Sequence, residues 1–214
     1  MLEPIHYACL QDRTGTLLQE LTERAPFLQH YTLVGGSALA LYLQHRKSED
    51  LDFFTYADTF DSNQILEFCS RWDSLKILNK SAEQLDLLID GVKVTFFDAR
   101  WSFLHPDTPQ SLNIATLEAI AAMKVHVLFL RAKYRDYYDI FFLAHKAMGL
   151  TELFECAKRV VPGLTMKLFC IALTYIDDIE DDSINHLDPV SQISKEDIRA
   201  YFEQQIRREE LLKT

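Results

Sequence analysis

The segment from residue 33 to residue 53 constrains the fold of this chain more than any other. It reads as a short apolar strand, a Gly-Gly-Ser turn at residues 35–37, an apolar helix and a second strand beside Asp50 and Asp52. Side chains alternate between the two faces of a strand, so the two aspartates are predicted to share one face while their apolar neighbours point into a core. The segment therefore predicts a sheet with a helix between two of its strands.

The paired aspartates and the glycine turn together indicate phosphate chemistry. Two neighbouring carboxylates repel each other, and a divalent cation with oxygen ligands, Mg²⁺ or Mn²⁺, relieves that repulsion. The turn leaves backbone N–H groups open at a helix N-terminus, where phosphate binds well. Phosphoryl or nucleotidyl transfer needs such a pairing of metal site and phosphate cradle. The alternatives are two surface aspartates on an edge strand and a Ser37 that only caps the helix.

Composition sets the class of protein. A chain of 214 residues with 48% hydrophobic content forms one compact domain or two small lobes. Apolar runs fall short of the roughly 20 residues that span a bilayer, so we expect no membrane association. The four cysteines have neither metal-ligand nor disulfide-framework spacing, which predicts reduced thiols in a cytoplasmic protein: Cys9, Cys69, Cys156 and Cys170.

The charge argues against general nucleic-acid binding but leaves room for a local site. The net charge is −10, whereas affinity for a phosphate backbone comes from clustered Lys and Arg. Residues 124–167 carry eight basic and four acidic side chains, a net charge of +4. This basic island is suited to a nucleotide or a tRNA end, and the alternative is a set of ordinary solvated helix faces.

The order of elements predicts an α+β chain. A mixed-sheet lobe with helices is expected over residues 1–110 and a helical lobe over residues 111–214. Asp90-Gly91 predicts a two-residue hairpin turn that pairs residues whose numbers sum to 181, so Asp86 faces Thr95. Strands are expected at 31–34, 51–55, 75–78 and within 85–97; helices are expected at 5–30, 37–45, 61–71, 116–132, 136–148, 151–159, 164–177 and 195–212.

These motifs resemble the nucleotidyltransferase superfamily of the DNA polymerase β type. More narrowly, the chain resembles the AbiEii-type nucleotidyltransferases, toxins of bacterial abortive-infection and type IV toxin–antitoxin systems. The resemblance spans roughly residues 30 to 182. Its motifs are residues 35–41, 45–54, 91–97 and 119–124, Arg131, and residues 135–139.

The resemblance implies roles for particular residues. It implies catalytic roles for Asp50, Asp52, Lys124 and Asp136, and a metal on the first two. The implied nucleotide-binding residues are Gly35, Gly36, Ser37, Arg46, Ser48, Arg131 and Arg135. Arg46 has a simpler alternative, an ion pair with Glu49 or Asp50.

The helical motif carries two further expectations. Lys124 and Arg131 are seven residues apart and share a helix face, which predicts a cationic stripe that neutralises a triphosphate. The family pattern implies a helix break near residues 133–134, which would make Asp136 both a cap and a site residue.

One position departs from the superfamily. Its third carboxylate, on a neighbouring strand, is replaced here by Thr95. The hairpin register offers Asp86 as a substitute metal ligand on the same face, whereas Asp98 has the opposite parity. The alternative for Asp86 is a plain surface residue.

The expected function is transfer of a nucleotide from a nucleoside triphosphate, dependent on Mg²⁺ or Mn²⁺. The resemblance implies toxin-like action on a tRNA, another RNA or a protein, and a cognate antitoxin. The alternative is a catalytically weakened relative that binds a nucleotide or a partner without turnover, and the missing third carboxylate supports it.

Overall fold

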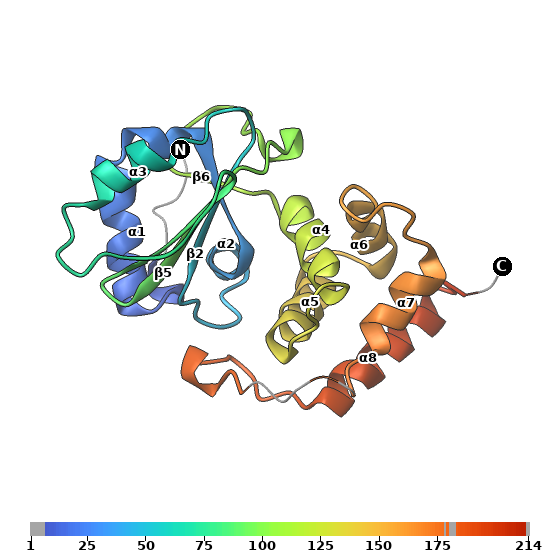
Figure 1. Ribbon diagram of the computed structural model, residues 1–214. Helices are drawn as coiled ribbons and strands as arrows, with labels where there is room; N and C mark the ends of the chain where they lie inside the picture. The colour runs from blue at the N-terminus through green and yellow to red at the C-terminus, as the bar shows by residue number, and fades with distance from the viewer. Residues whose placement is uncertain (1–6, 178, 180–182, 213–214) are drawn as a thin grey trace. The chain divides into compact units, whose positions relative to one another are not determined.

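The chain folds into two compact units that meet in sequence between Thr116 and Leu117. A computed structural model describes residues 7–177, 179 and 183–212, and each unit is an α/β or helical body of its own (Figure 1). The expected boundary at residue 110 lies too early. Residues 113–114 form a short strand, β6, that pairs with β1 and so belongs to the first unit.

The first unit is built on a mixed sheet of the α+β kind expected. Among the described residues the strand order is β3-β4-β5-β2-β1-β6. β2 lies in the middle, antiparallel to β1 and parallel to β5. The strands are β1 (Tyr31–Val34), β2 (Leu51–Thr55), β3 (Lys76–Lys80), β4 (Gln84–Ile89), β5 (Val92–Phe97) and β6 (Asn113–Ile114).

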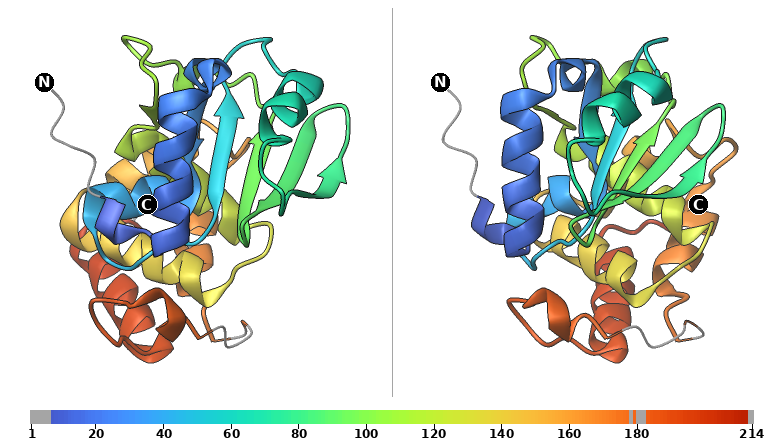
Figure 2. Two further views of the ribbon diagram at one scale, coloured as in Figure 1. Left: turned by 90° about the vertical axis from the view of Figure 1, so that its left-hand side faces the viewer. Right: turned by 60° about the vertical axis from the view of Figure 1, so that its left-hand side comes forward.

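Helices cover both faces of this sheet. α1 and α3 lie over one face and α2 lies over the other (Figures 1 and 2). The first face holds the core, where the ring of Phe96 stacks on Phe53 and meets Phe27 and Tyr31 edge-on. The helical segments of the unit are η1 (Tyr7–Cys9), α1 (Asp12–Arg24), η2 (Pro26–His30), α2 (Gly35–Leu43), α3 (Ser62–Cys69) and η3 (Ser102–Leu104).

The hairpin register predicted from Asp90-Gly91 is confirmed. Both turn residues have positive φ, 50° and 83°, as a type I′ turn requires. Every β4–β5 pair sums to 181, and Asp86 lies opposite Thr95. Since Thr95 is also the β2 partner of Asp52, three positions that bear on the proposed chemistry stand in one row across the sheet.

The expected opening helix over residues 5–30 is wrong in extent. Its first two residues lie outside the described chain, and the described part is three segments, of which α1 is the only full helix. The chain is extended at Gln11, whose N–H donates to the carbonyl of Ser48. Pro26 starts a separate 3-10 turn, because proline has no N–H for a continuing helix.

The second unit is helical, as predicted. Its expected first helix, 116–132, is shorter: it ends at Leu128, and Ala132 adopts a positive φ of 41° before α5 begins at Tyr134. The helix break expected at 133–134 is therefore confirmed. No helix among the described residues is long and apolar enough to cross a bilayer. The unit comprises α4 (Leu117–Leu128), α5 (Tyr134–Lys146), α6 (Leu150–Ala157), α7 (Met166–Thr174), η4 (Asn185–Leu187) and α8 (Lys195–Arg208).

Candidate active site

Gly35 brings the start of α2 against the carboxylate of Asp52. Its φ is +71°, and a Cβ placed on it would lie 2.7 Å from Asp52 Oδ2. A side chain therefore fits neither the backbone conformation nor the space. Glycine at this position lets the first peptide units of the helix approach the carboxylate directly.

Gly36 makes the same kind of close approach to two other predicted site residues. A Cβ on Gly36 would lie 2.9 Å from Arg46 Nη2 and 3.1 Å from Ser48 Oγ. Arg46 and Ser48 are both 5% exposed. The N-terminus of a helix carries partial positive charge, so a buried guanidinium beside it concentrates positive potential there. This potential favours an anion such as a phosphate group.

Ser37 is not the cap of α2, which corrects the simpler alternative considered for it. The N-cap position is Val34, and no side chain caps the helix. Ser37 is the third helical residue, buried at 1% exposure, and its hydroxyl donates to the carbonyl of Asp50. It therefore ties the helix to the segment that carries the aspartates, and the first turn of α2 has no side-chain cap.

The four residues before β2 are held by their backbone carbonyls. Arg46 Nη1 donates to the carbonyl of Lys47 at 2.9 Å, and the Gln11 N–H donates to that of Ser48 at 2.9 Å. Thr14 Oγ1 donates to the carbonyl of Glu49 at 2.9 Å, and Ser37 to that of Asp50. Four consecutive carbonyls thus have partners, and the last three partners come from other parts of the fold, whereas Arg46 is the neighbour of Lys47 in sequence. Such anchoring fixes the backbone from which the Asp50 and Asp52 side chains project.

The two aspartates share a face, as the strand alternation predicts. Asp50 and Asp52 are partly exposed, while Leu51 and Phe53 are 0% exposed. β2 is an interior strand with neighbours on both sides, so the edge-strand alternative is wrong. Two adjacent carboxylates beside an uncapped helix start are oxygen ligands of the kind that Mg²⁺ and Mn²⁺ take.

Asp86 is held by its own partners beside this pair. Thr95 Oγ1 donates to Asp86 Oδ1 at 2.8 Å, and Gln84 Nε2 lies 3.0 Å from Oδ1 and 2.8 Å from Oδ2. Asp86 is 8% exposed, so it is no plain surface residue. It stands two strands from Asp52, roughly 9.5 Å between Cα atoms at normal strand spacing.

The role of Asp86 as a third metal ligand stays a prediction, because carboxylates on strands at this separation can each bring one oxygen to a shared cation. In the part of the chain that the structure describes, no three His, Cys, Asp or Glu side chains are grouped to hold a metal.

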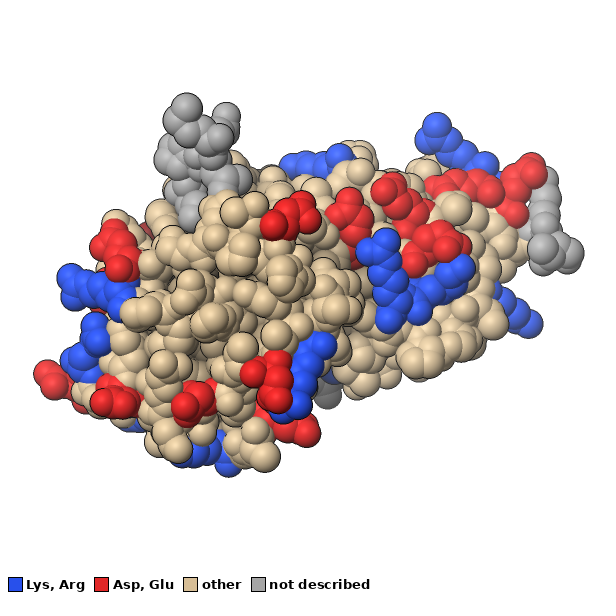
Figure 3. Space-filling view, turned by 90° about the horizontal axis from the view of Figure 1, so that it is seen from above, with Lys and Arg blue, Asp and Glu red and all other residues tan. Residues whose placement is uncertain are grey.

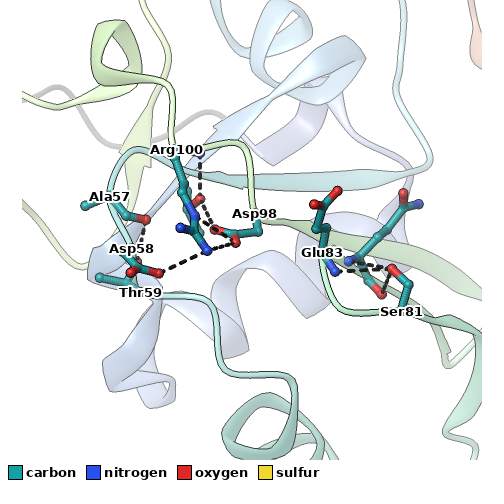
Figure 4. Close-up of polar contacts among 9 residues, drawn as sticks. Ala57, Asp58, Thr59, Ser81, Glu83, Asp98 and Arg100 are labelled. Atoms are coloured by element: carbon teal, nitrogen blue, oxygen red, sulfur yellow. Dashed lines mark hydrogen bonds and ion pairs between the residues drawn. The ribbon is translucent and has the colours of Figure 1, made fainter.

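Asp98 takes part in a different cluster. Its Oδ1 accepts from Thr55 Oγ1 at 3.1 Å, and its Oδ2 pairs with the guanidinium of Arg100. The same guanidinium reaches Asp58 at 3.1 Å, and Figure 4 shows Arg100 directed at both carboxylates. Asp98 therefore belongs to the end of β2 near Thr55, in agreement with the parity expected for it.

In the helical unit, the expected cationic stripe is instead an ion network. Lys124 Nζ lies 2.5 Å from Asp139 Oδ2 and 3.4 Å from Asp136 Oδ1. Arg131 Nε lies 3.3 Å from Asp136 Oδ2. Lys124, Asp136 and Asp139 are nearly or fully buried, and burying an ammonium group is costly unless carboxylates compensate it.

The break between α4 and α5 creates this network. Asp136 also accepts, at 3.4 Å, from the N–H of Lys133, the residue before α5. The expected capping role of Asp136 is therefore confirmed, and its role as a site residue stays a prediction. Arg135, the second residue of α5, is partly exposed.

The surface charges are intermixed on the face shown in Figure 3, where basic side chains lie beside acidic ones. Within the basic island, Lys124 and Arg131 contact Asp136, and Lys158 pairs with Glu155 at 2.8 Å. The local excess of positive charge is thus partly compensated inside the unit.

Two residues of the site escaped the sequence analysis. Thr14, which holds the carbonyl of Glu49, is 35 residues away in sequence, and no local pattern marks it. Gln84 has the parity of Asp86 on the same strand, and that shared parity is the signal that could have found it.

A match to a protein-family model identifies the chain as a nucleotidyltransferase of a known family. The family model described as "Nucleotidyl transferase AbiEii toxin, Type IV TA system" matches residues 16–101 and 84–210. The chain belongs to this family of toxins.

One relative is similar in sequence, and two solved structures are similar in fold. An uncharacterized protein of Aquifex aeolicus (strain VF5) is 30% identical over 182 residues, covering 81% of this chain and 88% of that protein. The nucleotidyltransferase toxin MenT4 from Mycobacterium tuberculosis H37Rv has a similar fold, with a TM-score of 0.61 and 20% identity over 94% of this chain and 82% of MenT4. A proposed nucleotidyltransferase from H. pylori has a TM-score of 0.53 and 18% identity over 95% of this chain and 99% of that one.

The contact between Gly35 and Asp52 can be tested by Gly35→Ala, with Gly163→Ala as a matched control. Both glycines have φ above +70°, but a Cβ on Gly163 meets no atom within 4 Å. Each substitution carries the strain of a left-handed residue, about 1–2 kcal/mol. Gly35→Ala adds the collision with Asp52, so its loss of unfolding free energy in urea should be clearly the larger. Equal losses in the two variants would contradict the close approach.

Proposed function

We propose that this protein is a metal-dependent nucleotidyltransferase that transfers a nucleotide from a nucleoside triphosphate to an RNA acceptor. Asp50 and Asp52 would hold Mg²⁺ or Mn²⁺, and the cation would supply polarisation of the α-phosphate and orientation of the triphosphate. The N–H groups of residues 35–37 bind phosphate oxygens at the start of α2, and Arg46 and Ser48 complete the phosphate site. The acceptor hydroxyl displaces pyrophosphate.

One observation carries the proposal most directly. The carboxylate of Asp52 lies so close to Gly35 that a Cβ there would stand 2.7 Å from its oxygen. A cation on Asp52 is then within reach of phosphates bound at the helix start. Metal site and phosphate cradle are thus parts of a single local structure, as nucleotidyl transfer requires.

The helical unit carries the residues of the family's later motif. We propose nucleotide-binding roles for Lys124, Arg131 and Arg135, and Asp136 contacts Lys124 and Arg131 through its two oxygens. Family membership supports these roles, because the residues stand in the family's later motif. A cation held by carboxylates is pre-organised and needs little reorganisation when a phosphate binds.

Family membership also supports the biological part of the proposal. The acceptor is a tRNA or another RNA, with a protein as the alternative, and a cognate antitoxin counters the toxin. Triphosphates and RNA are both cytoplasmic, so the proposal places the protein in the bacterial cytoplasm. The net charge of −10 favours recognition of a limited part of the RNA over extensive contact with its backbone.

A second candidate is a binding module of the same fold that retains a nucleotide without turnover. Thr95 favours it, because a hydroxyl stands on the strand next to Asp52 where a third carboxylate would complete a metal site. Binding of triphosphate and Mg²⁺ without transfer to any RNA would select this candidate.

The metal assignment predicts the behaviour of Asp50→Asn and Asp52→Asn. Label transfer from α-³²P-labelled triphosphates to total RNA should fall at least about 100-fold, equivalent to about 2.7 kcal/mol. Thermal stability should hold or rise, because one of two repelling charges is removed. Asp73→Asn, at an exposed position between α3 and β3, the strand at the far end of the order from β2 and β1, serves as the control. Wild-type transfer by either site variant would contradict the metal assignment.

The hydrogen bond from Ser37 to the carbonyl of Asp50 allows effects on folding stability to be separated from effects on triphosphate binding. Ser37→Ala and Thr14→Val each remove one buried hydroxyl that holds a carbonyl before β2. Each should cost about 0.5–1.5 kcal/mol of unfolding free energy. Only the Ser37 hydroxyl joins the phosphate cradle itself to the backbone of Asp50, so only Ser37→Ala should weaken triphosphate affinity strongly, by about tenfold or 1.4 kcal/mol. Calorimetric titration with triphosphate and Mg²⁺ measures this, and equal affinities in both variants would reduce Ser37 to a tether.

A further inference from the structure

Asp52, Thr95 and Asp86 lie side by side on three neighbouring strands. The proposed metal and phosphate sites use Asp52 but neither Thr95 nor Asp86. Thr95 lies between the two aspartates, paired with Asp52 on β2 and with Asp86 on β4. All three side chains therefore stand on one face of the sheet. Thr95 and Asp86 are 7% and 8% exposed, so the hydroxyl and the carboxylate are largely shielded from bulk water.

The hydrogen bonds in this row have a fixed direction. A threonine hydroxyl has one proton and two lone pairs, and Thr95 directs its proton to Asp86 Oδ1 at 2.8 Å. Toward β2 and Asp52 the same oxygen can only accept. Gln84 holds both oxygens of Asp86 at 2.8–3.0 Å, so the carboxylate cannot turn away from Thr95. Thr95, which lies next to Asp52 on the neighbouring strand, thus presents an oxygen that can accept a proton. The same hydroxyl is hydrogen-bonded to the fixed carboxylate of Asp86.

We propose that Thr95 and Asp86 form the proton-accepting pair of the transfer reaction, a role that rests on the proposed function. Thr95 Oγ1 accepts the proton of the attacking acceptor hydroxyl, and the proton of Thr95 passes to Asp86 Oδ1. The acceptor oxygen forms its bond to the α-phosphorus as the bond from that phosphorus to the pyrophosphate oxygen breaks, and pyrophosphate leaves with the electron pair. Thr95 touches the substrate, and Asp86 acts through it as the positioning residue that takes the proton.

Three variants distinguish this relay from a structural hydrogen bond. Asp86→Asn keeps an oxygen that can accept from Thr95 but is a far weaker base. Thr95→Val keeps the shape and removes the hydroxyl, whereas Thr95→Ser keeps the hydroxyl. Asp98→Asn is the control, because Asp98 is an acidic residue of the same region that is bonded to Thr55 and Arg100 instead.

The experiment measures kcat and KM for label transfer from α-³²P-labelled triphosphates, with Mg²⁺, to total RNA by the full-length protein. Loss of a general base lowers rates by about 10²–10⁴-fold. Asp86→Asn and Thr95→Val should lower kcat about 100-fold or more and leave KM for triphosphate within about twofold. Thr95→Ser should recover most of the loss. The double variant should be no slower than the worse single variant, because the two residues act as one unit.

The outcomes separate the inference from the proposed function. A wild-type protein that transfers no label contradicts the proposed function, and the relay falls with it. An active wild type with an unaffected Asp86→Asn variant contradicts the relay alone. Losses that multiply in the double variant, or that follow the folded fraction measured by circular dichroism, would reduce the pair to a structural contact.

Discussion

The structure of the site depends on the anchoring of the chain between α2 and β2. Four consecutive carbonyls, from Lys47 to Asp50, accept hydrogen bonds from Arg46, the backbone near η1, α1 and α2. Two carboxylates on one strand face repel each other, and a mobile loop would let them separate. The anchored backbone prevents this and keeps both carboxylates in place as oxygen ligands suited to a cation.

The glycines at the start of α2 place the proposed phosphate site directly against the anchored segment. Without side chains at Gly35 and Gly36, the helix start lies against Asp52, Arg46 and Ser48. In the helical unit, the buried contacts of Lys124 with Asp136 and Asp139 serve a related purpose. A cation placed among carboxylates is fixed in position, at the cost that removing either partner leaves a buried charge uncompensated. Both units therefore build their proposed functional groups into rigid local structure.

Much of this was predictable because the relevant patterns are local. Strand alternation placed Asp50 and Asp52 on one face, and the Asp90-Gly91 turn fixed the register that pairs Asp86 with Thr95. What could not be predicted depends on contacts distant in sequence. The interruption at Gln11 comes from pairing with Ser48, and the short strand β6 exists because β1 offers it an edge. Ser37 resembles a helix cap in sequence, but the helix begins two residues earlier, and its hydroxyl is used across the fold.

The central claim is that Asp50 and Asp52 hold a divalent cation beside phosphates bound at the start of α2. The most direct measurement is a crystal structure of the protein with Mn²⁺ and a non-hydrolysable triphosphate, with manganese located by its anomalous scattering. The account predicts a manganese peak within about 2.0–2.6 Å of oxygens of both aspartates, and phosphate oxygens at the N–H groups of residues 35–37. Manganese bound elsewhere, or a triphosphate seated away from the helix start, would contradict it.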